Sequence, residues 1–119
     1  MHELSLADAI VAIARDHAGE RRVVAVDVRI GRLRQVVPDA LEFAFALVAS
    51  GTSVEGAELR VEHVAARVAC AGCDAVTEVT GFPLVCARCG SFDVEVVAGE
   101  ELQVESIDVE DEPVAVGGR

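Results

Sequence analysis

The chain has 119 residues, 52% of them hydrophobic, and a formal net charge of -11 at pH 7. This length suits one domain, or one domain with a small satellite, and the hydrophobic content excludes disorder over most of the chain. A strongly acidic chain without Lys, Trp or Tyr repels nucleic-acid phosphates and lacks most of the side chains that stack on bases. We therefore predict a protein that does not bind nucleic acid.

The sequence also lacks signals for membrane insertion and secretion. No apolar run approaches the roughly 20 residues that a membrane helix needs. The start, Met1-His2-Glu3, has no basic segment ahead of an apolar one, as a signal peptide would have. We predict a cytoplasmic protein with no membrane association.

Hydrophobic periodicity predicts two helices. Between Leu4 and Ala18, apolar residues recur at three- and four-residue steps, and Gly19 supplies a stop. A second helix is expected from Pro38, which suits the first helical position, to a stop at Gly51.

Alternating apolar and polar residues predict three strands of one sheet, at 23–30, 57–65 and about 101–109. In the last strand the alternation changes phase at Ser106, as a β-bulge would make it. The remaining residues, 111–119, are acidic and then rich in Pro and Gly, and we predict that they form a disordered tail.

All four cysteines lie in two C-x-x-C pairs, Cys70-Ala-Gly-Cys73 and Cys86-Ala-Arg-Cys89. Such pairs are typical of two knuckles that present four thiolates to one tetrahedral zinc ion. Two disulfides or redox-active dithiols are alternatives, but the chain shows no signal for an oxidising compartment, and a redox role would leave one pair unused. Four thiolates fill the coordination shell, so the predicted zinc site is structural.

The predicted elements indicate an α+β fold with a small, mostly antiparallel three-stranded sheet and two helices on one side. The cysteine pairs interrupt this layer. We therefore predict an α+β domain at 1–65 and 98–110 and an inserted four-cysteine, zinc-ribbon-like module at 66–97. The sequence offers no Gly-rich phosphate loop, no Ser-His-Asp arrangement and no spare thiol, so we predict that the protein is not an enzyme.

The three histidines differ in how well they suit a role as metal ligands. His17, near the end of the first helix, and His63, on a strand, are most simply structural. His2 follows the first residue, which brings the Met1 amine, the imidazole and the intervening backbone amides close together. Such nitrogens suit a planar divalent ion such as Ni²⁺ or Cu²⁺, although a frayed terminal histidine is the simpler interpretation of the local sequence alone.

Several short motifs occur along the chain in a definite order. They are Met1-His2-Glu3 at the start of a helix, Gly31-Arg32-Leu33, Val36 before Pro38, Phe43-Ala44-Phe45, Gly51-Thr52, Glu55-Gly56-Ala57-Glu58-Leu59, the two cysteine pairs, and Gly99-Glu100-Glu101-Leu102. With these motifs in this order and spacing, from residue 1 to about residue 110, the chain resembles the HypA/HybF family of hydrogenase nickel-incorporation factors.

The resemblance implies a nickel metallochaperone that delivers Ni²⁺, with a nickel-delivery GTPase, to the large subunit of [NiFe]-hydrogenase; a homodimer is also compatible with it. His2 matches the nickel ligand of the family, joined in some members by the residue-1 amine and by Glu3. A further carboxylate near the second helix is used by some relatives, and Asp39 is the nearest candidate here. The family's zinc ligands match Cys70, Cys73, Cys86 and Cys89.

An alternative from another class is a zinc-ribbon interaction module with no transferable metal, whose acidic surface binds a protein partner. The two hypotheses differ in whether the chain binds nickel stoichiometrically through His2.

Overall fold

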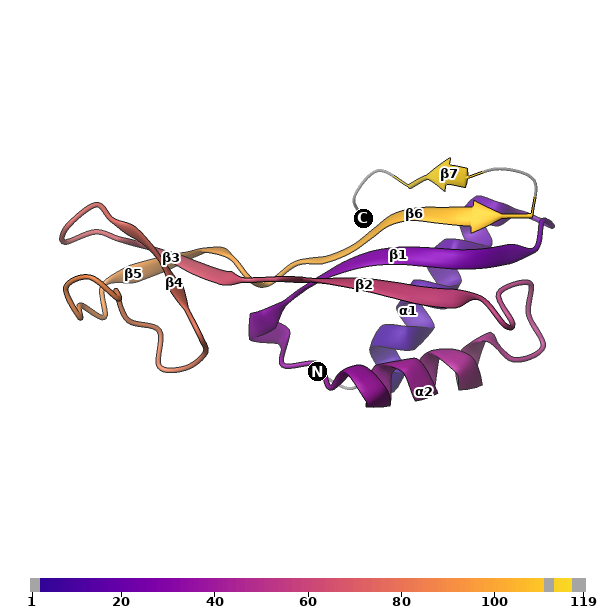
Figure 1. Cartoon of the computed structure of the whole chain (residues 1–119), viewed down its shortest axis with the longest axis horizontal. Coiled ribbons are helices and arrows are strands. Elements are labelled where there is room, and N and C mark those ends of the chain that lie inside the picture. Colours follow the sequence, from indigo (N-terminus) through magenta and orange to yellow (C-terminus); the bar gives the residue numbers. More distant parts are fainter. Residues whose placement is uncertain (1–2, 111–112, 117–119) are drawn as a thin grey trace. The chain divides into compact units, whose positions relative to one another are not determined.

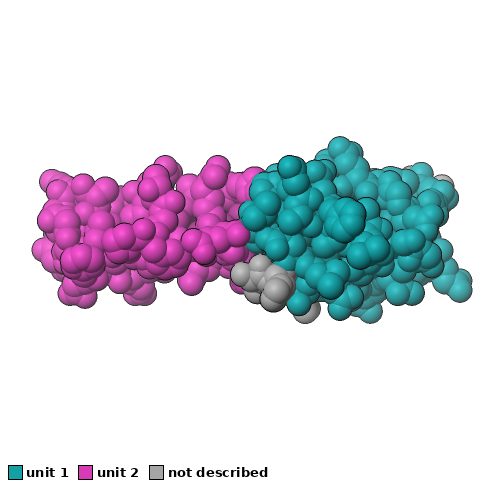
Figure 2. Space-filling model, turned by 90° about the horizontal axis from the view of Figure 1, so that it is seen from below, with its two compact units in different colours: residues 1–29, 36–62, 102–119 teal, residues 30–35, 63–101 magenta. Residues whose placement is uncertain are grey.

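The computed structural model describes residues 3–110 and 113–116, which divide into two compact units. Unit 1 comprises residues 1–29, 36–62 and 102–119, and unit 2 comprises residues 30–35 and 63–101 (Figure 2). This division differs from the predicted one mainly in residues 30–35, which belong with the cysteine-containing segment although they lie far from it in the sequence. Among the described residues, no helix combines the length and hydrophobicity needed to cross a membrane.

Unit 1 contains two helices, α1 (Glu3–Ala18) and α2 (Pro38–Ala49). Its sheet has the strand order β2-β1-β6-β7, formed by β1 (Val23–Gly31), β2 (Glu58–Val64), β6 (Leu102–Val109) and β7 (Pro113–Ala115). Both helices lie on the same side of this sheet, and α1 packs against α2 (Figure 1). The α+β class, both predicted helices and the three predicted strands are thereby confirmed.

The strand directions follow from the side-chain pairs across the sheet. Arg60 of β2 bonds Asp27 of β1, and Glu62 pairs with Arg29, so the contacts advance in the same direction along both strands and β1 and β2 are parallel. The helix α2 forms the crossover between them (Figure 1). By contrast, β6 lies antiparallel to β7 and runs opposite to β1.

The fourth strand, β7, corrects the prediction of a disordered tail for residues 113–115. Backbone pairing joins Ser106 to Ala115 and Ile107 to Val114. The buried residues of β6 show the predicted change of phase. Val104, Ile107 and Val109 are buried, so the buried positions are separated first by three residues and then by two.

The core of unit 1 forms where the apolar faces of both helices meet the sheet. On α1 these side chains recur at helical spacing, whereas on β1 the alternation is imperfect. Val24 alternates with Val26 and Val28 in the sequence, as residues on one face of a strand do, but it is 44% exposed while its neighbour Val23 is buried. The buried helical and strand residues of unit 1 include Leu6, Ala7, Ile10, Val11, Ala14, Ala18, Val26, Val28, Leu41, Ala44, Phe45 and Ala49.

Unit 2 is built on a second, three-stranded antiparallel sheet in the order β4-β3-β5. Its strands are β3 (Ala66–Cys70), β4 (Val76–Val79) and β5 (Val94–Ala98). Its core is small. Ala66, Val68 and Val79 are buried, and Leu33, Leu84, Val94 and Val96 pack against them while partly exposed.

Residues 30–35, which include the short 3₁₀ helix η1 (Arg32–Arg34), belong to unit 2 through backbone bonds to residues 99–101. The N–H of Gly31 donates to the Glu101 carbonyl at 2.8 Å, and the N–H of Leu33 donates to the Gly99 carbonyl at 2.8 Å. The backbone segments around Gly31 and Gly99 approach so closely that a Cβ at Gly31 would overlap the carbonyl of Gly99. Glycine at this position is therefore a steric requirement.

We expect Gly31→Ala to lower the free energy of unfolding by about 1–3 kcal/mol, because an added methyl group must push two hydrogen-bonded backbones apart. Urea unfolding monitored by circular dichroism measures the change. Gly72→Ala is the matched control in unit 2, since a Cβ at Gly72 would meet its nearest atom, Cys70 Sγ, at an ordinary 3.7 Å. Equal stability of the two variants would show that the contact at Gly31 relaxes without cost.

Candidate metal centre

Both cysteine pairs adopt the same backbone turn. In each, the residue four positions after the first cysteine donates its N–H to the carbonyl of that cysteine: Asp74 to Cys70 at 2.9 Å, and Gly90 to Cys86 at 2.8 Å. This turn folds the chain back so that both thiols of a pair point the same way. The first turn continues directly from β3, whose last residue is Cys70.

The residue that closes each turn lies in the left-handed region of backbone conformation, with φ of 60° at Asp74 and 78° at Gly90. The second turn reaches this conformation at a glycine, whereas the first reaches it at Asp74. Asp tolerates this conformation better than most residues because its short polar side chain bonds locally.

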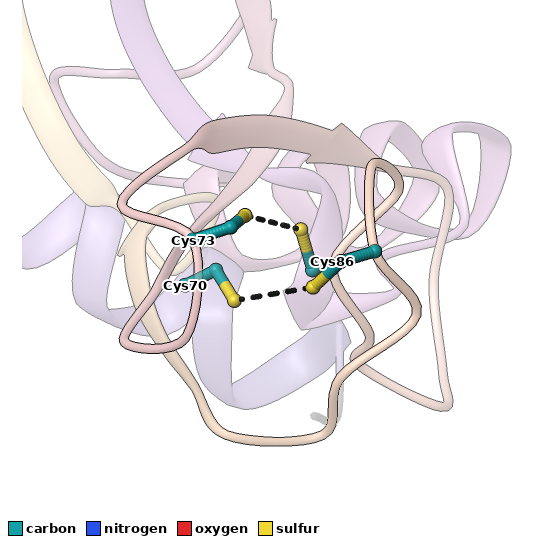
Figure 3. A group of neighbouring side chains, drawn as sticks. Cys70, Cys73 and Cys86 are labelled. Carbon is teal, nitrogen blue, oxygen red and sulfur yellow. Dashed lines mark hydrogen bonds between the residues drawn. The ribbon is translucent and has the colours of Figure 1, made fainter.

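The four sulfur atoms come together in one cluster, with all ligand atoms within 4.8 Å of one another. Each short contact joins the two pairs: Cys70 Sγ lies 3.6 Å from Cys89 Sγ, and Cys73 Sγ lies 3.7 Å from Cys86 Sγ. Figure 3 shows the side chains of Cys70, Cys73 and Cys86 turned toward one another. A tetrahedron with Zn–S bonds of about 2.3 Å has sulfur–sulfur edges of about 3.8 Å, so these distances fit a four-thiolate site.

The surroundings of the cluster are uneven. Cys70 and Cys86 are buried, Cys73 is partly buried and Cys89 is exposed, and all four are free thiols. The N–H of Cys89 lowers the pKa of Cys86 to about 6, assisted by the N–H of Arg88 and opposed by burial. The N–H of Ser91 acts to lower the pKa of Cys89, but the neighbouring thiols outweigh it and raise that pKa to about 11.

The raised pKa of Cys89 reflects the crowding of the four sulfur atoms. Four sulfurs at this spacing cannot all carry negative charge unless a cation lies among them, because like charges this close disfavour ionisation. A divalent metal ion would supply that charge and hold all four as thiolates. Within residues 3–110 and 113–116, this cluster is the one group of three or more His, Cys, Asp or Glu side chains arranged to hold a metal ion.

The cluster is held by hydrogen bonds to the sheet of unit 2. The N–H of Ala71 donates to the Asp93 carbonyl at 3.0 Å, which joins the first turn to the start of β5. The N–H of Ala87 donates to Thr77 Oγ1 at 3.1 Å, which joins the second turn to β4. Both turns are thus fixed to the same three-stranded sheet, which holds their sulfur atoms in place relative to one another.

The predicted nickel-binding end of the chain is only partly visible. Met1 and His2 lie outside the described residues, and Glu3 is the first residue of α1. Glu3 Oε2 accepts a hydrogen bond from the N–H of Val37 at 3.0 Å. Val37 is the N-cap residue of α2 and has no side-chain cap of its own, so the Glu3 carboxylate serves a helix end that the local sequence leaves uncapped.

The sequence did not identify Val37 as a partner of Glu3. The one local signal was Pro38, which marks the start of a helix but does not say what approaches it. Asp39, the other carboxylate considered, lies exposed in the first turn of α2.

The remaining histidines take separate positions. His17 Nδ1 lies 3.0 Å from the carbonyl of Ile13, one turn earlier in α1, which fits the structural role predicted for it. His63 is exposed on β2, beside a hollow of about 370 Å³ lined also by Arg32 and Glu78.

Comparison with known proteins agrees with this arrangement. Residues 1–109 match the family described as "Hydrogenase/urease nickel incorporation, metallochaperone, hypA". A hydrogenase maturation factor HypA from Geobacter metallireducens is 44% identical over 110 residues, covering 92% of this chain and 100% of the relative. Another, from Chloroflexus aurantiacus, is 45% identical over 112 residues, covering 91% and 98%.

The fold is also similar to that of the Ni metallochaperone HypA from Helicobacter pylori, with a TM-score of 0.66 and 24% identity over 92% of this chain and 97% of that one. The α+β fold, the four clustered cysteines and the match along almost the whole chain agree with one another. The chain therefore belongs to the HypA family of hydrogenase and urease nickel-incorporation metallochaperones.

Proposed function

We propose that this protein binds Ni²⁺ at its N-terminus and delivers it, with a nickel-delivery GTPase, to the large subunit of [NiFe]-hydrogenase. In this function the four cysteines hold a structural Zn²⁺. The membership in a family of nickel-incorporation metallochaperones supports the proposal.

The observation that carries the proposal is the closure of the cysteine cluster. Four ligand atoms within 4.8 Å of one another complete a tetrahedral shell and leave no position for a second ligand or a transferable metal. A metal that is to be handed over therefore needs another site. Ni²⁺ prefers planar or tetragonal nitrogen and oxygen ligands rather than a tetrahedron of thiolates.

The proposed nickel ligands are the Met1 amine, the backbone nitrogens of His2 and Glu3, and the His2 imidazole. The hydrogen bond from Val37 to the Glu3 carboxylate ties the residue next to His2 to the start of α2. Protonation or a competing partner can release a metal held by nitrogen ligands, whereas zinc in four thiolates is much harder to remove. One metal is cargo and the other is part of the scaffold.

We expect the protein to bind one Ni²⁺ per chain, and one residue added before Met1 to weaken this binding at least tenfold, or about 1.4 kcal/mol. The extension turns the terminal amine into a peptide nitrogen while every side chain stays in place. Isothermal titration and the visible absorption of planar Ni²⁺ measure the change. One residue added after Arg119 is the control, and it should leave both signals unaltered.

Two results would count against this arrangement. Unchanged affinity and spectra after N-terminal extension would exclude the amine and leave His2 with carboxylates such as Glu3 or Asp39. No stoichiometric nickel binding by the full chain would favour the alternative function, an interaction module with zinc alone.

A further inference from the structure

The helix α2 has two apolar faces, and only one of them is buried. Its inward face packs Leu41, Ala44 and Phe45 into the core of unit 1. On the outward face Phe43 is 73% exposed and Leu47 is 60% exposed. These two side chains are four residues apart, so they lie next to each other on the helix surface.

Small apolar residues continue this outward face. Ala40 and Ala46 are exposed as well, and they lie three residues from Phe43 on either side. We call Ala40, Phe43, Ala46 and Leu47 the α2 stripe. A surface helix normally carries polar side chains on its outward face, and an exposed apolar face of this kind marks an interaction site.

The charged residues of α2 itself have one sign. Asp39 and Glu42 are the only charged residues of α2, both are exposed, and α2 has no basic residue. The residues that follow the helix, 50–57, add Glu55 and no basic residue. A surface that is apolar along its centre and acidic at its edge is complementary to one that is apolar with basic residues beside it.

This charge pattern decides among the possible occupants. A second copy of the chain would bring Asp39 and Glu42 toward an α2 that has no basic residue to pair with them. The chain's own C-terminal segment begins Glu110-Asp111-Glu112 and carries the same sign. Neither is complementary to the α2 stripe.

We propose that the α2 stripe binds an amphipathic helix of a partner protein, one with Leu-like residues on its apolar side and Lys or Arg beside them. Phe43 is the main anchor, because aromatic side chains at the centre of an interface contribute most to affinity. Asp39 and Glu42 pair with the basic residues and set the orientation. The α2 stripe itself contains no metal ligand, and Asp39 is not among the nickel ligands proposed above, so binding here does not depend on that nickel chemistry.

The probe for this surface is a synthetic amphipathic peptide of about 18 residues, or five helical turns, with Leu along one side and Lys beside it. Its binding to the full-length, zinc-loaded protein is measured by fluorescence anisotropy at several salt concentrations. We expect Phe43→Gln with Leu47→Gln to weaken binding at least about tenfold. Glutamine keeps the helix propensity and the net charge, so the loss reports the apolar contact.

Two comparisons separate docking from general attraction to an acidic protein. Phe92→Gln is the matched control, because Phe92 is 74% exposed in unit 2 and its replacement should leave affinity unchanged. Asp39→Asn with Glu42→Gln should weaken binding and reduce its salt dependence. A peptide with Glu in place of Lys should bind at least about tenfold more weakly than the Lys peptide.

Three results would overturn the proposal. The Gln double variant and the unaltered protein could bind the Lys peptide equally well. Phe92→Gln could weaken binding as much as the Gln double variant does. Finally, sedimentation could show a dimer that Phe43→Gln with Leu47→Gln dissociates, in which case a second copy occupies the α2 stripe.

Discussion

A protein in which Cys86 is replaced by Ser is expected to lose its zinc and most of the ordered structure of unit 2, while unit 1 stays folded. Cys86 is 1% exposed, and its Sγ lies 3.7 Å from that of Cys73 in the cluster. Replacing one of four thiolates removes a quarter of the ligand set and leaves three thiols that repel one another when ionised.

The effect should be confined to unit 2 because that unit has little else to stabilise it. Its buried apolar cluster contains three residues, Ala66, Val68 and Val79, none of them larger than valine. A core of this size does not offset the conformational entropy lost on ordering some 40 residues. Binding of structural zinc supplies about 10–16 kcal/mol in small zinc-dependent domains, so folding of unit 2 should depend on the metal.

Metal analysis and hydrogen exchange test this prediction together. Protein as purified should carry one zinc per chain, and Cys86→Ser should carry little. Amide protection should fall across β3, β4 and β5, and it should persist in α1 and β1. Ala87→Ser is the control, since it adds a hydroxyl group to the same turn but removes no sulfur; full zinc content and normal protection in Cys86→Ser itself would contradict the prediction.

The second large effect is expected at the opposite end of the chain. His2→Ala should weaken nickel binding by at least about 100-fold, or about 2.8 kcal/mol, because it removes the only imidazole of the proposed nitrogen set. Zinc content and thermal stability should change little, since a side chain at the terminus contributes little to the core.

The matched control is His63→Ala, which removes an exposed imidazole from a strand and should leave nickel affinity unchanged. Isothermal titration with Ni²⁺ and zinc analysis on all three proteins provide the comparison. In cells, hydrogenase activity should fall in His2→Ala and recover in part with excess nickel. Nickel affinity that is unaltered in His2→Ala would exclude this histidine as a principal ligand.

Patterns that repeat within a few residues were sufficient to predict both helices and three of the four strands of unit 1. The four-residue spacing of Leu6, Ile10 and Ala14 indicated α1 within one residue of its observed limits, Glu3–Ala18. The Cys-x-x-Cys spacing is also a short-range pattern, and it indicated a four-sulfur cluster. Two cysteines at this spacing can present their thiols to one metal ion, and a tetrahedral zinc site needs two such pairs.

Short strands gave weaker signals. β3 and β4 have five and four residues, so their alternation is too brief to separate from chance, and they were found only in the sheet that they form around the cluster. The exposure of Val24 and the pairing of β7 with β6 depend likewise on which neighbour lies across the sheet.

The tertiary structure alone decided contacts between residues far apart in the sequence. Gly31 approaches Gly99 across 68 residues, and Glu3 bonds the backbone of Val37 across 34. Every residue except proline carries the same backbone N–H, so the sequence does not show which N–H a distant side chain will contact. A glycine in the sequence likewise does not show whether it lies in a loop or where two backbone segments come into contact. The sequence therefore determined both helices, three strands of unit 1 and the pairing of the four clustered cysteines, whereas the packing of distant backbones placed residues 30–35 in unit 2 and the start of α1 at the start of α2.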